Sequence, residues 1–181
     1  MPAWSSVVTM TQLVLTAVGD DREGLVSALS RVVEAHGGNW LDSQLARLAG
    51  KFAGIVLVEV PADRVTAFTA ESAQLQGEIC WKIDAVVASG GGAEAREVHV
   101  QLVGLDRPGM VRQISAALAD HHVSIRGFRS WTHHAPQGGG LLFEAEATLA
   151  LPADLAMDDV RAALEPIADE LMVDLELAET S

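Results

Sequence analysis

An eight-residue segment occurs twice in this chain, and it constrains the fold more than any other feature of the sequence. It reads GDDREGLV at residues 19–26 and GLDRPGMV at residues 104–111, with the same residue at five of the eight positions. Each copy follows a run rich in Leu and Val, which is typical of a strand, and precedes apolar residues at helical spacing. A segment repeated at a fixed offset indicates a duplicated structural unit. We therefore expect two copies of one fold, each with this segment between its first strand and its first helix.

The residues around the repeated segment predict the order β-α-β-β-α-β in each half. In the first half, strands are expected at residues 11–18, 39–50, 52–60 and 79–87. One helix is expected after the repeated segment and another after Pro61, and the apolar residues of the first helices, Val26 and Val111 among them, should face the core. The second half repeats the order from residue 98, with a longer hairpin whose tip is expected at residues 131–140. This order predicts an α+β protein with two ferredoxin-like βαββαβ domains in tandem.

The domain boundaries follow from the repeat and from a run of small residues between the halves. We expect an N-terminal extension at residues 1–9, a first domain at 10–88, a Gly-rich linker at 89–95 and a second domain at 96–178. Each domain has sheet edges that need to be covered or paired, and tandem copies can pair with each other or with a second chain. A homodimer is therefore expected.

The charge and hydropathy of the chain narrow its partners and its location. It carries 25 acidic and 12 basic side chains, for a formal net charge of −13. Direct binding to DNA or RNA relies on Lys and Arg side chains that neutralise phosphates, so no direct nucleic-acid contact is expected. The N-terminus lacks the basic and apolar regions of a signal peptide, and no apolar run approaches the ~20 residues that span a bilayer. We expect a cytoplasmic protein with no membrane contact.

Side chains that often carry catalysis or bind metals do not form a known pattern in this sequence. The single cysteine, Cys80, excludes an internal disulfide and a CxxC motif, and its position predicts a small buried strand residue. The histidine pairs at residues 121–122 and 133–134 lack the spacing of metal ligands. No nucleophile, phosphate-binding or dinucleotide-binding motif is present. We therefore expect a non-enzymatic protein without a metal or a cofactor.

The repeated segment offers groups that suit a small charged ligand. A helix N-terminus presents unpaired backbone N–H groups and the positive end of the helix dipole, which attract a carboxylate. Gly19 and Gly24 would let a ligand approach the backbone closely. Asp20 and Asp21 would either cap the helix or face an ammonium group. Since the side-chain amide of Asn39, at the start of the second strand, can both donate and accept, these groups suit a zwitterionic amino acid.

A purely structural interpretation of the same residues stays open. A Gly-Asp-Asp run before a helix is an ordinary N-cap arrangement, and a proline such as Pro108 is typical of the first turn of a helix. In that case the repetition indicates a shared ancestor and says little about a ligand.

The repeated segments also resemble a known family of domains. Their DR[EP]G[LM]V pattern, followed in the first half by GNWLDSQLARL, resembles tandem ACT domains, which are small-molecule regulatory modules with the βαββαβ fold. More closely, GDDREGLV and the run GGNWLDSQLARLAGKFAGIVLV at residues 37–58 resemble the glycine cleavage system transcriptional repressor family. This resemblance implies an amino-acid ligand, glycine for the repressors, at the segment between the first strand and the first helix, often at an interface between ACT domains. It also implies repression through a partner transcription activator, without direct contact with DNA.

The resemblance further implies which residues bind the ligand. In the first domain they are Gly19, Asp20, Asp21, Arg22, Glu23, Gly24, Leu25, Val26, Asn39 and Trp40. In the second domain they are Asp106, Arg107, Pro108, Gly109, Met110 and Ser124. The second domain departs from the pattern, because Ser124 replaces the Asn and Gly127 replaces Asp42. Trp40 stands where such families usually have Ile, and it would either reshape the pocket or pack in a core or an interface.

The sequence thus leads to one hypothesis and two alternatives. The hypothesis is a non-enzymatic, amino-acid-sensing regulator, similar to the glycine cleavage repressors, that acts on transcription through a partner protein. The first alternative is an amino-acid-responsive regulatory subunit that docks on a metabolic enzyme. The second alternative is a dimerisation module without a ligand.

Overall fold

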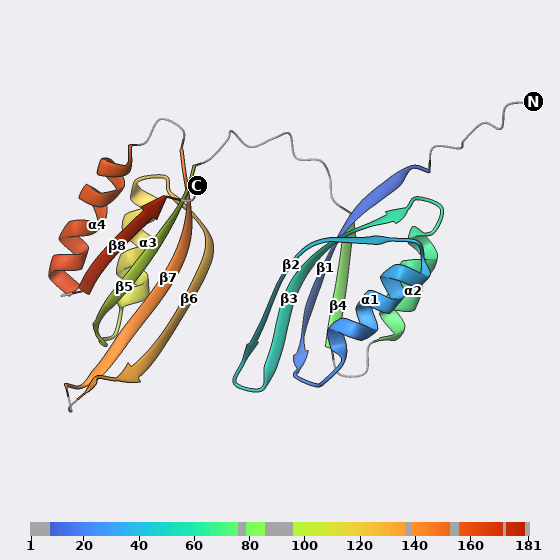
Figure 1. Cartoon of the computed structure of the whole chain (residues 1–181), viewed down its shortest axis with the longest axis horizontal. Coiled ribbons are helices and arrows are strands. Elements are labelled where there is room, and N and C mark those ends of the chain that lie inside the picture. Colours follow the sequence, from blue (N-terminus) through green and yellow to red (C-terminus); the bar gives the residue numbers. More distant parts are fainter. Residues whose placement is uncertain are drawn as a thin grey trace, which may run out of the picture. The chain divides into compact units, whose positions relative to one another are not determined.

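The computed structural model describes residues 8–75, 79–85, 96–136, 139–152, 156–171 and 173–179. The chain divides into two units, Met1–Ser89 and Gly90–Ser181, and each unit has the element order β-α-β-β-α-β (Figure 1). This order confirms the predicted α+β fold with two ferredoxin-like domains. The predicted linker at residues 89–95 and most of the predicted extension at residues 1–9 lie outside the described residues.

Unit 1 forms one antiparallel sheet with the strand order β2-β3-β1-β4. Its elements are β1 (Met10–Asp20), α1 (Leu25–Ala35), β2 (Asn39–Leu48), β3 (Lys51–Pro61), α2 (Val65–Gln74) and β4 (Ile79–Ala85). Strands β2 and β3 are joined by a two-residue turn at Ala49 and Gly50, where both residues have positive φ, as type I′ hairpins require. Strand β2 pairs only with β3 in the described part of the chain, so it is an edge strand.

Unit 2 forms the matching sheet with the strand order β6-β7-β5-β8. Its elements are β5 (Arg96–Leu105), α3 (Met110–Asp120), β6 (Ser124–His134), β7 (Leu141–Leu151), α4 (Met157–Leu171) and β8 (Val173–Glu179). The predicted hairpin tip at residues 131–140 is wrong in part, because β6 continues through Trp131 to His134. These residues stay extended since they pair with residues 141–144 of β7.

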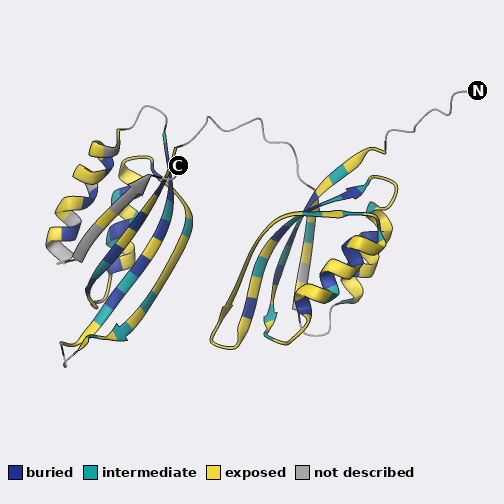
Figure 2. Ribbon diagram, in the orientation of Figure 1, coloured by how far each residue is buried: buried dark blue, intermediate teal, exposed yellow. Residues whose placement is uncertain are grey.

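Each core lies between one face of the sheet and the two helices of the same unit (Figure 1). Buried and exposed residues alternate along the central strands, as the two-residue period of a strand requires (Figure 2). The unit 1 core includes Leu15, Val56 and Phe68, and the unit 2 core includes Leu102 and Leu149. Phe68 of α2 is 0% exposed, so this helix is held to its sheet by a fully buried aromatic ring.

The sheet faces turned away from the helices differ between the two units. In unit 1 this face, called here the apolar face, carries Val14, Thr16, Val18, Ala53, Ile55 and Leu57. In unit 2 the equivalent surface, called the polar face, carries His99, Gln101, Arg129, Glu144, Glu146 and Thr148. The strand registers of the two units match, so one backbone arrangement carries two chemically different surfaces.

Three residues predicted to face a core are exposed instead. Val26 and Val111, the second residues of α1 and α3, are 42% and 45% exposed. Cys80 is exposed on β4, where it pairs with Val18. Direct cross-strand partners point to the same side of a sheet, and the side of Val18 is the one turned away from the helices. The prediction of a buried Cys80 is therefore wrong.

Candidate functional site

The two repeated segments start α1 and α3 with the same backbone geometry. Gly24 and Gly109 are the N-cap residues and adopt the left-handed conformation, with φ of 85° and 95°. Their carbonyl oxygens accept hydrogen bonds from the N–H of Ala28 at 2.8 Å and of Gln113 at 3.0 Å. The left-handed N-cap explains why both segments have glycine here, because residues with a Cβ rarely adopt this conformation.

The capping arrangement expected from the sequence is wrong in both units. No side chain caps α1 or α3 among the residues that the structure describes, so neither Asp20 nor Asp21 acts as a cap. Pro108 lies two residues before Met110, the first helical residue, and therefore outside the first turn. The first-turn N–H groups thus have no side-chain cap at a position where the helix dipole favours an anion.

The two aspartates of the first segment contact cations of the β2–β3 hairpin instead. Asp21 Oδ2 lies 2.6 Å from Arg47 Nε, and Asp20 forms an ion pair with Lys51. The backbone N–H of Asp21 also donates to the carbonyl oxygen of Gly50 at 3.0 Å. These contacts attach the segment to the tip of the hairpin, and they place two cations where the ammonium group of a ligand was expected.

The second segment makes the same backbone contact as the first segment, but its neighbours differ from those that form the two ion pairs of unit 1. The N–H of Asp106 donates to the carbonyl oxygen of Leu141 at 2.8 Å, the contact that matches the one in unit 1. The strand registers place Thr132 and Leu142 where unit 1 has its two cations, and Leu105 where unit 1 has the first of its two aspartates. The two ion pairs of unit 1 therefore have no counterpart at the equivalent positions of unit 2.

The other segment residues divide into core and surface positions. Leu25 and Met110 are 7% and 2% exposed and belong to the two cores, so their side chains pack and do not face a ligand. Arg22, Glu23 and Val26 are exposed. The first segment thus presents one basic, one acidic and one apolar side chain beside the N-terminus of α1.

Asn39 lies at the opposite end of the unit 1 sheet from the repeated segment. It pairs with Glu59 of β3, whereas Gly19 pairs with Phe52, and the distance along β3 between these two partners is about 24 Å. The side-chain amide of Asn39 donates to Glu59 Oε1 at 3.4 Å. Helix α1 returns the chain to the end of the sheet where β1 begins, and this is why β2 starts far from the segment.

Trp40 and Ser124 are separated from the segments in the same way. Trp40 packs against the unit 1 core. Ser124 pairs with Ala150 at the equivalent end of the unit 2 sheet. Neither unit therefore brings its second-strand candidates, Asn39 and Trp40 or Ser124, to its own repeated segment.

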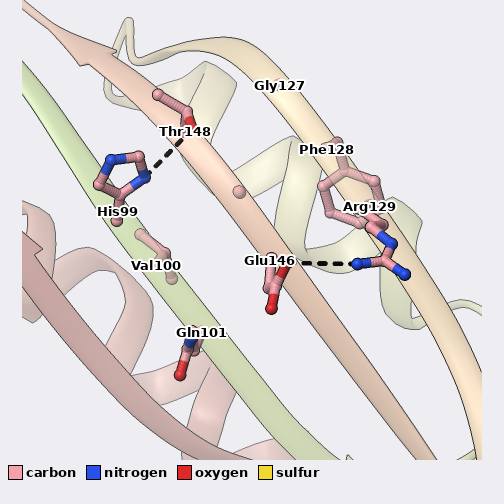
Figure 3. Close-up of a pocket in the computed structure, with 9 residues that line it drawn as sticks. His99, Val100, Gln101, Gly127, Phe128, Arg129, Glu146 and Thr148 are labelled. Carbon is pink, nitrogen blue, oxygen red and sulfur yellow. Dashed lines mark hydrogen bonds and ion pairs between the residues drawn. The ribbon is translucent and has the colours of Figure 1, made fainter. Parts of the chain in front are cut away.

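Unit 2 has a hollow on its polar face that was not predicted from the sequence. It has a volume of about 510 Å³ and lies over Gly127 of β6. Its polar side chains come from three adjacent strands, and they are His99, Gln101, Arg129, Glu146 and Thr148 (Figure 3). The available signal was the glycine itself, because a glycine inside a strand often marks a place where a ligand or another chain approaches closely.

The described residues also bear on metal binding and on membrane insertion. Among the described residues, no group of three His, Cys, Asp or Glu side chains is placed to hold a metal ion. In that same part of the chain, every helix is too short or too polar to span a lipid bilayer.

Comparison with known proteins gives matches in both units. An ACT-domain family model matches residues 11–76, and a second ACT-domain model matches residues 98–165. The chain is 28% identical over 163 residues to the glycine cleavage system transcriptional repressors of Escherichia coli K12 and Shigella flexneri, covering 88% of this chain and 85% of each relative. A crystal structure of an unknown protein from Galdieria sulphuraria superposes with a TM-score of 0.86 at 27% identity, covering 96% of this chain and 100% of the other.

Proposed function

Because this chain belongs to the ACT-domain family and carries two such domains in tandem, we propose that it is a non-enzymatic regulator that senses an amino acid. The observation that carries the proposal is the similarity to glycine cleavage system transcriptional repressors, which covers 88% of the chain. In this proposal the regulated process is transcription and the amino acid is glycine. The net charge of −13 favours action through a partner protein in the cytoplasm, such as a transcription activator, over direct contact with DNA.

The ligand of this proposal binds at the first repeated segment, over the N-terminus of α1. Its carboxylate accepts hydrogen bonds from the uncapped N–H groups of the first helical turn, with support from the helix dipole. There is room for it, because a Cβ added to Gly24 would meet no atom within 4 Å. The ammonium group of the ligand faces Glu23, since Asp20 and Asp21 already pair with cations.

A second chain is needed if Asn39 and Trp40 are to contact the same ligand. Within unit 1 they lie about 24 Å along the sheet from the segment, too far for one small molecule to touch both. A homodimer that brings the start of β2 of one chain to the segment of another chain satisfies this requirement. We therefore include a homodimer in the proposal.

The second segment is the weaker glycine site in this proposal. Arg107, Pro108 and Gly109 lead into an uncapped helix, as in unit 1. However, Leu105 and Leu142 replace a charged pair beside it, so fewer polar groups surround a bound zwitterion.

Titration of the full-length chain with glycine, followed by calorimetry and by backbone amide NMR, tests this function. Val26→Glu places a carboxylate beside the uncapped N–H groups of α1. The helix dipole stabilises this carboxylate, and its charge repels the carboxylate of a ligand. Because Val26 is 42% exposed and lies outside the core, the variant should fold. We expect it to weaken glycine binding several-fold.

Val111→Glu is the matched control, since Val111 holds the equivalent position in α3 and is 45% exposed. If the first segment is the main site, this control keeps most of the affinity for glycine. The absence of any response to glycine and to the other common amino acids at millimolar concentration would contradict sensing.

Affinity capture with the tagged full-length chain, with and without glycine, tests the mode of action. Recovery of a DNA-binding transcription activator supports the proposal. Recovery of a metabolic enzyme in its place favours the alternative of a regulatory subunit.

A further inference from the structure

The hollow over Gly127 lies where one side chain is missing from a row that crosses the sheet. On the polar face, Gly127, Thr148 and His99 lie side by side on β6, β7 and β5. A Cβ added to Gly127 would lie 3.8 Å from Thr148, which is an ordinary contact distance, and the φ of Gly127 is not positive. Neither the backbone nor the neighbouring atoms require a glycine at this position.

Unit 1 shows that the same backbone arrangement accepts a side chain here. Both edge strands have an irregularity just before the position, between Trp40 and Asp42 in β2 and between Ile125 and Gly127 in β6. In unit 1 the position is occupied by Asp42, whose Oδ1 accepts a hydrogen bond from the N–H of Ser43 at 2.7 Å. The fold therefore does not require the glycine of unit 2, whose missing side chain leaves space over β6.

The walls of the hollow hold charged groups that satisfy each other only in part (Figure 3). Arg129 Nη1 lies 4.0 Å from Glu146 Oε2, beyond the roughly 2.7–2.9 Å of a charge-assisted hydrogen bond. The guanidinium also lies 4.8 Å from the centre of the Trp131 ring, a cation–π contact that orients it. Beside them, Thr148 Oγ1 and His99 Nδ1 are within hydrogen-bond distance at 3.2 Å. The guanidinium and the carboxylate thus retain donors and acceptors for a ligand.

We propose that this hollow is a second small-molecule site, and that it binds a free amino acid as a zwitterion. The carboxylate of the ligand pairs with Arg129 and its ammonium group pairs with Glu146. A zwitterion carries both charges on one carbon atom, so one small ligand can pair with both side chains at once. The volume of about 510 Å³ lies within the range of about 300–1,000 Å³ for small-molecule sites, so there is room for an amino-acid side chain beside His99 and Thr148.

The site is specific to unit 2 and does not depend on whether the first segment binds glycine. On the apolar face of unit 1, Val14, Ile55 and Leu57 hold the positions of His99, Glu146 and Thr148, and Thr16 holds the position of Gln101. Gln44 holds the position of Arg129. A substitution at Gln44 therefore provides a matched control in the other unit.

Backbone amide NMR of the full-length chain tests the proposal, with each common amino acid as a ligand. Acetate and methylamine serve as ligands that carry only one of the two charges. We expect an amino acid to shift the amides of β6 and β7 around Gly127, and each single-charge ligand to bind roughly tenfold more weakly. Gly127→Val places a side chain in the hollow beside Thr148 without strain in the backbone and should weaken these shifts. Because the Arg129 side chain is 77% exposed, Arg129→Gln should weaken binding by about two- to fivefold, and Gln44→Leu should leave it unchanged.

The outcomes separate this site from the proposed glycine site. Unchanged binding in folded Gly127→Val, or shifts confined to the repeated segments, overturns the second site and leaves sensing at the first segment intact. Shifts around Gly127 without shifts at residues 19–26 support the second site and contradict the first. If the amide spectrum shows that Gly127→Val does not fold, unchanged affinity in Arg129→Gln overturns the proposal. No response to any amino acid contradicts both sites.

Discussion

Replacing Gly38 by alanine should destabilise unit 1 strongly, because the position is closed by backbone atoms. An added Cβ would lie 2.8 Å from the carbonyl oxygen of Glu59, 3.1 Å from the carbonyl oxygen of Val33 and 3.1 Å from Val33 Cγ1. The two carbonyl groups belong to a strand and a helix and cannot rotate away. Overpacking of this kind costs about 1–3 kcal/mol, and we expect the upper part of that range.

The same substitution at Gly24 and Gly127 should cost less, for separate reasons. At Gly24 the added Cβ meets no atom within 4 Å, so the cost is only that of the left-handed backbone, about 1–2 kcal/mol. Part of this cost is offset, because alanine lowers the entropy of the unfolded chain by about 0.4–1 kcal/mol. At Gly127 neither penalty applies, so Gly127→Ala should leave the stability of unit 2 unchanged or slightly higher.

Hydrogen exchange followed by mass spectrometry measures these effects in the full-length chain, because peptides from each unit report its stability separately. In Gly38→Ala and Gly24→Ala, the unaffected unit 2 is an internal reference. The expected order of destabilisation is Gly38, then Gly24, then Gly127. A loss in Gly127→Ala equal to that in Gly38→Ala would refute the reasoning about close contacts, and also the view that Gly127 is not required by the fold.

Three further substitutions or reactions probe other contacts. Phe68→Ala should lower the stability of unit 1 by about 3–5 kcal/mol in denaturant unfolding, because the ring is 0% exposed; a loss below about 1 kcal/mol would contradict its place in the core. Arg47→Gln should cost less than about 1 kcal/mol, since the Arg47 side chain is 72% exposed, and the loss should shrink at high salt. A loss that does not depend on salt would argue against an ion pair with Asp21. Cys80 should react with one equivalent of a thiol reagent in the folded chain, and a requirement for denaturant would show that it is buried.

The architecture was predictable from the sequence because the apolar periods in each half predict the same order of strands and helices around the repeated segment. The repeated segment placed the first helix of each unit, and the periods of the apolar residues placed the strands around it. Local signals did not reveal the length of the β6–β7 hairpin. Trp131 to His134 lead into a Pro- and Gly-rich run that predicts a loop, whereas their pairing with β7 holds them extended.

The candidate site was less predictable, because it depends on where distant elements lie in the fold. A sequence pattern does not show that α1 returns the chain to the opposite end of the sheet, and for that reason Asn39 was expected near the segment. The ion pairs of Asp20 and Asp21 likewise depend on where the hairpin tip lies. The replacement of Asp42 by Gly127 was visible in the sequence, but the hollow it leaves depends on cross-strand neighbours.

The attachment of the first segment to the β2–β3 hairpin has a mechanical consequence. The tip of the hairpin is tied to the segment through Arg47, Lys51 and Gly50, and none of these contacts runs through the hydrophobic interior. A molecule that draws Asp21 away from Arg47 would release the edge strand β2 from the segment and leave the hydrophobic core of unit 1 unchanged. Binding of a ligand at the first segment would then change how the edge strand β2 can pair with another strand. In unit 2 the positions equivalent to Asp20, Arg47 and Lys51 hold Leu105, Thr132 and Leu142, so this route is built from residues of the first unit.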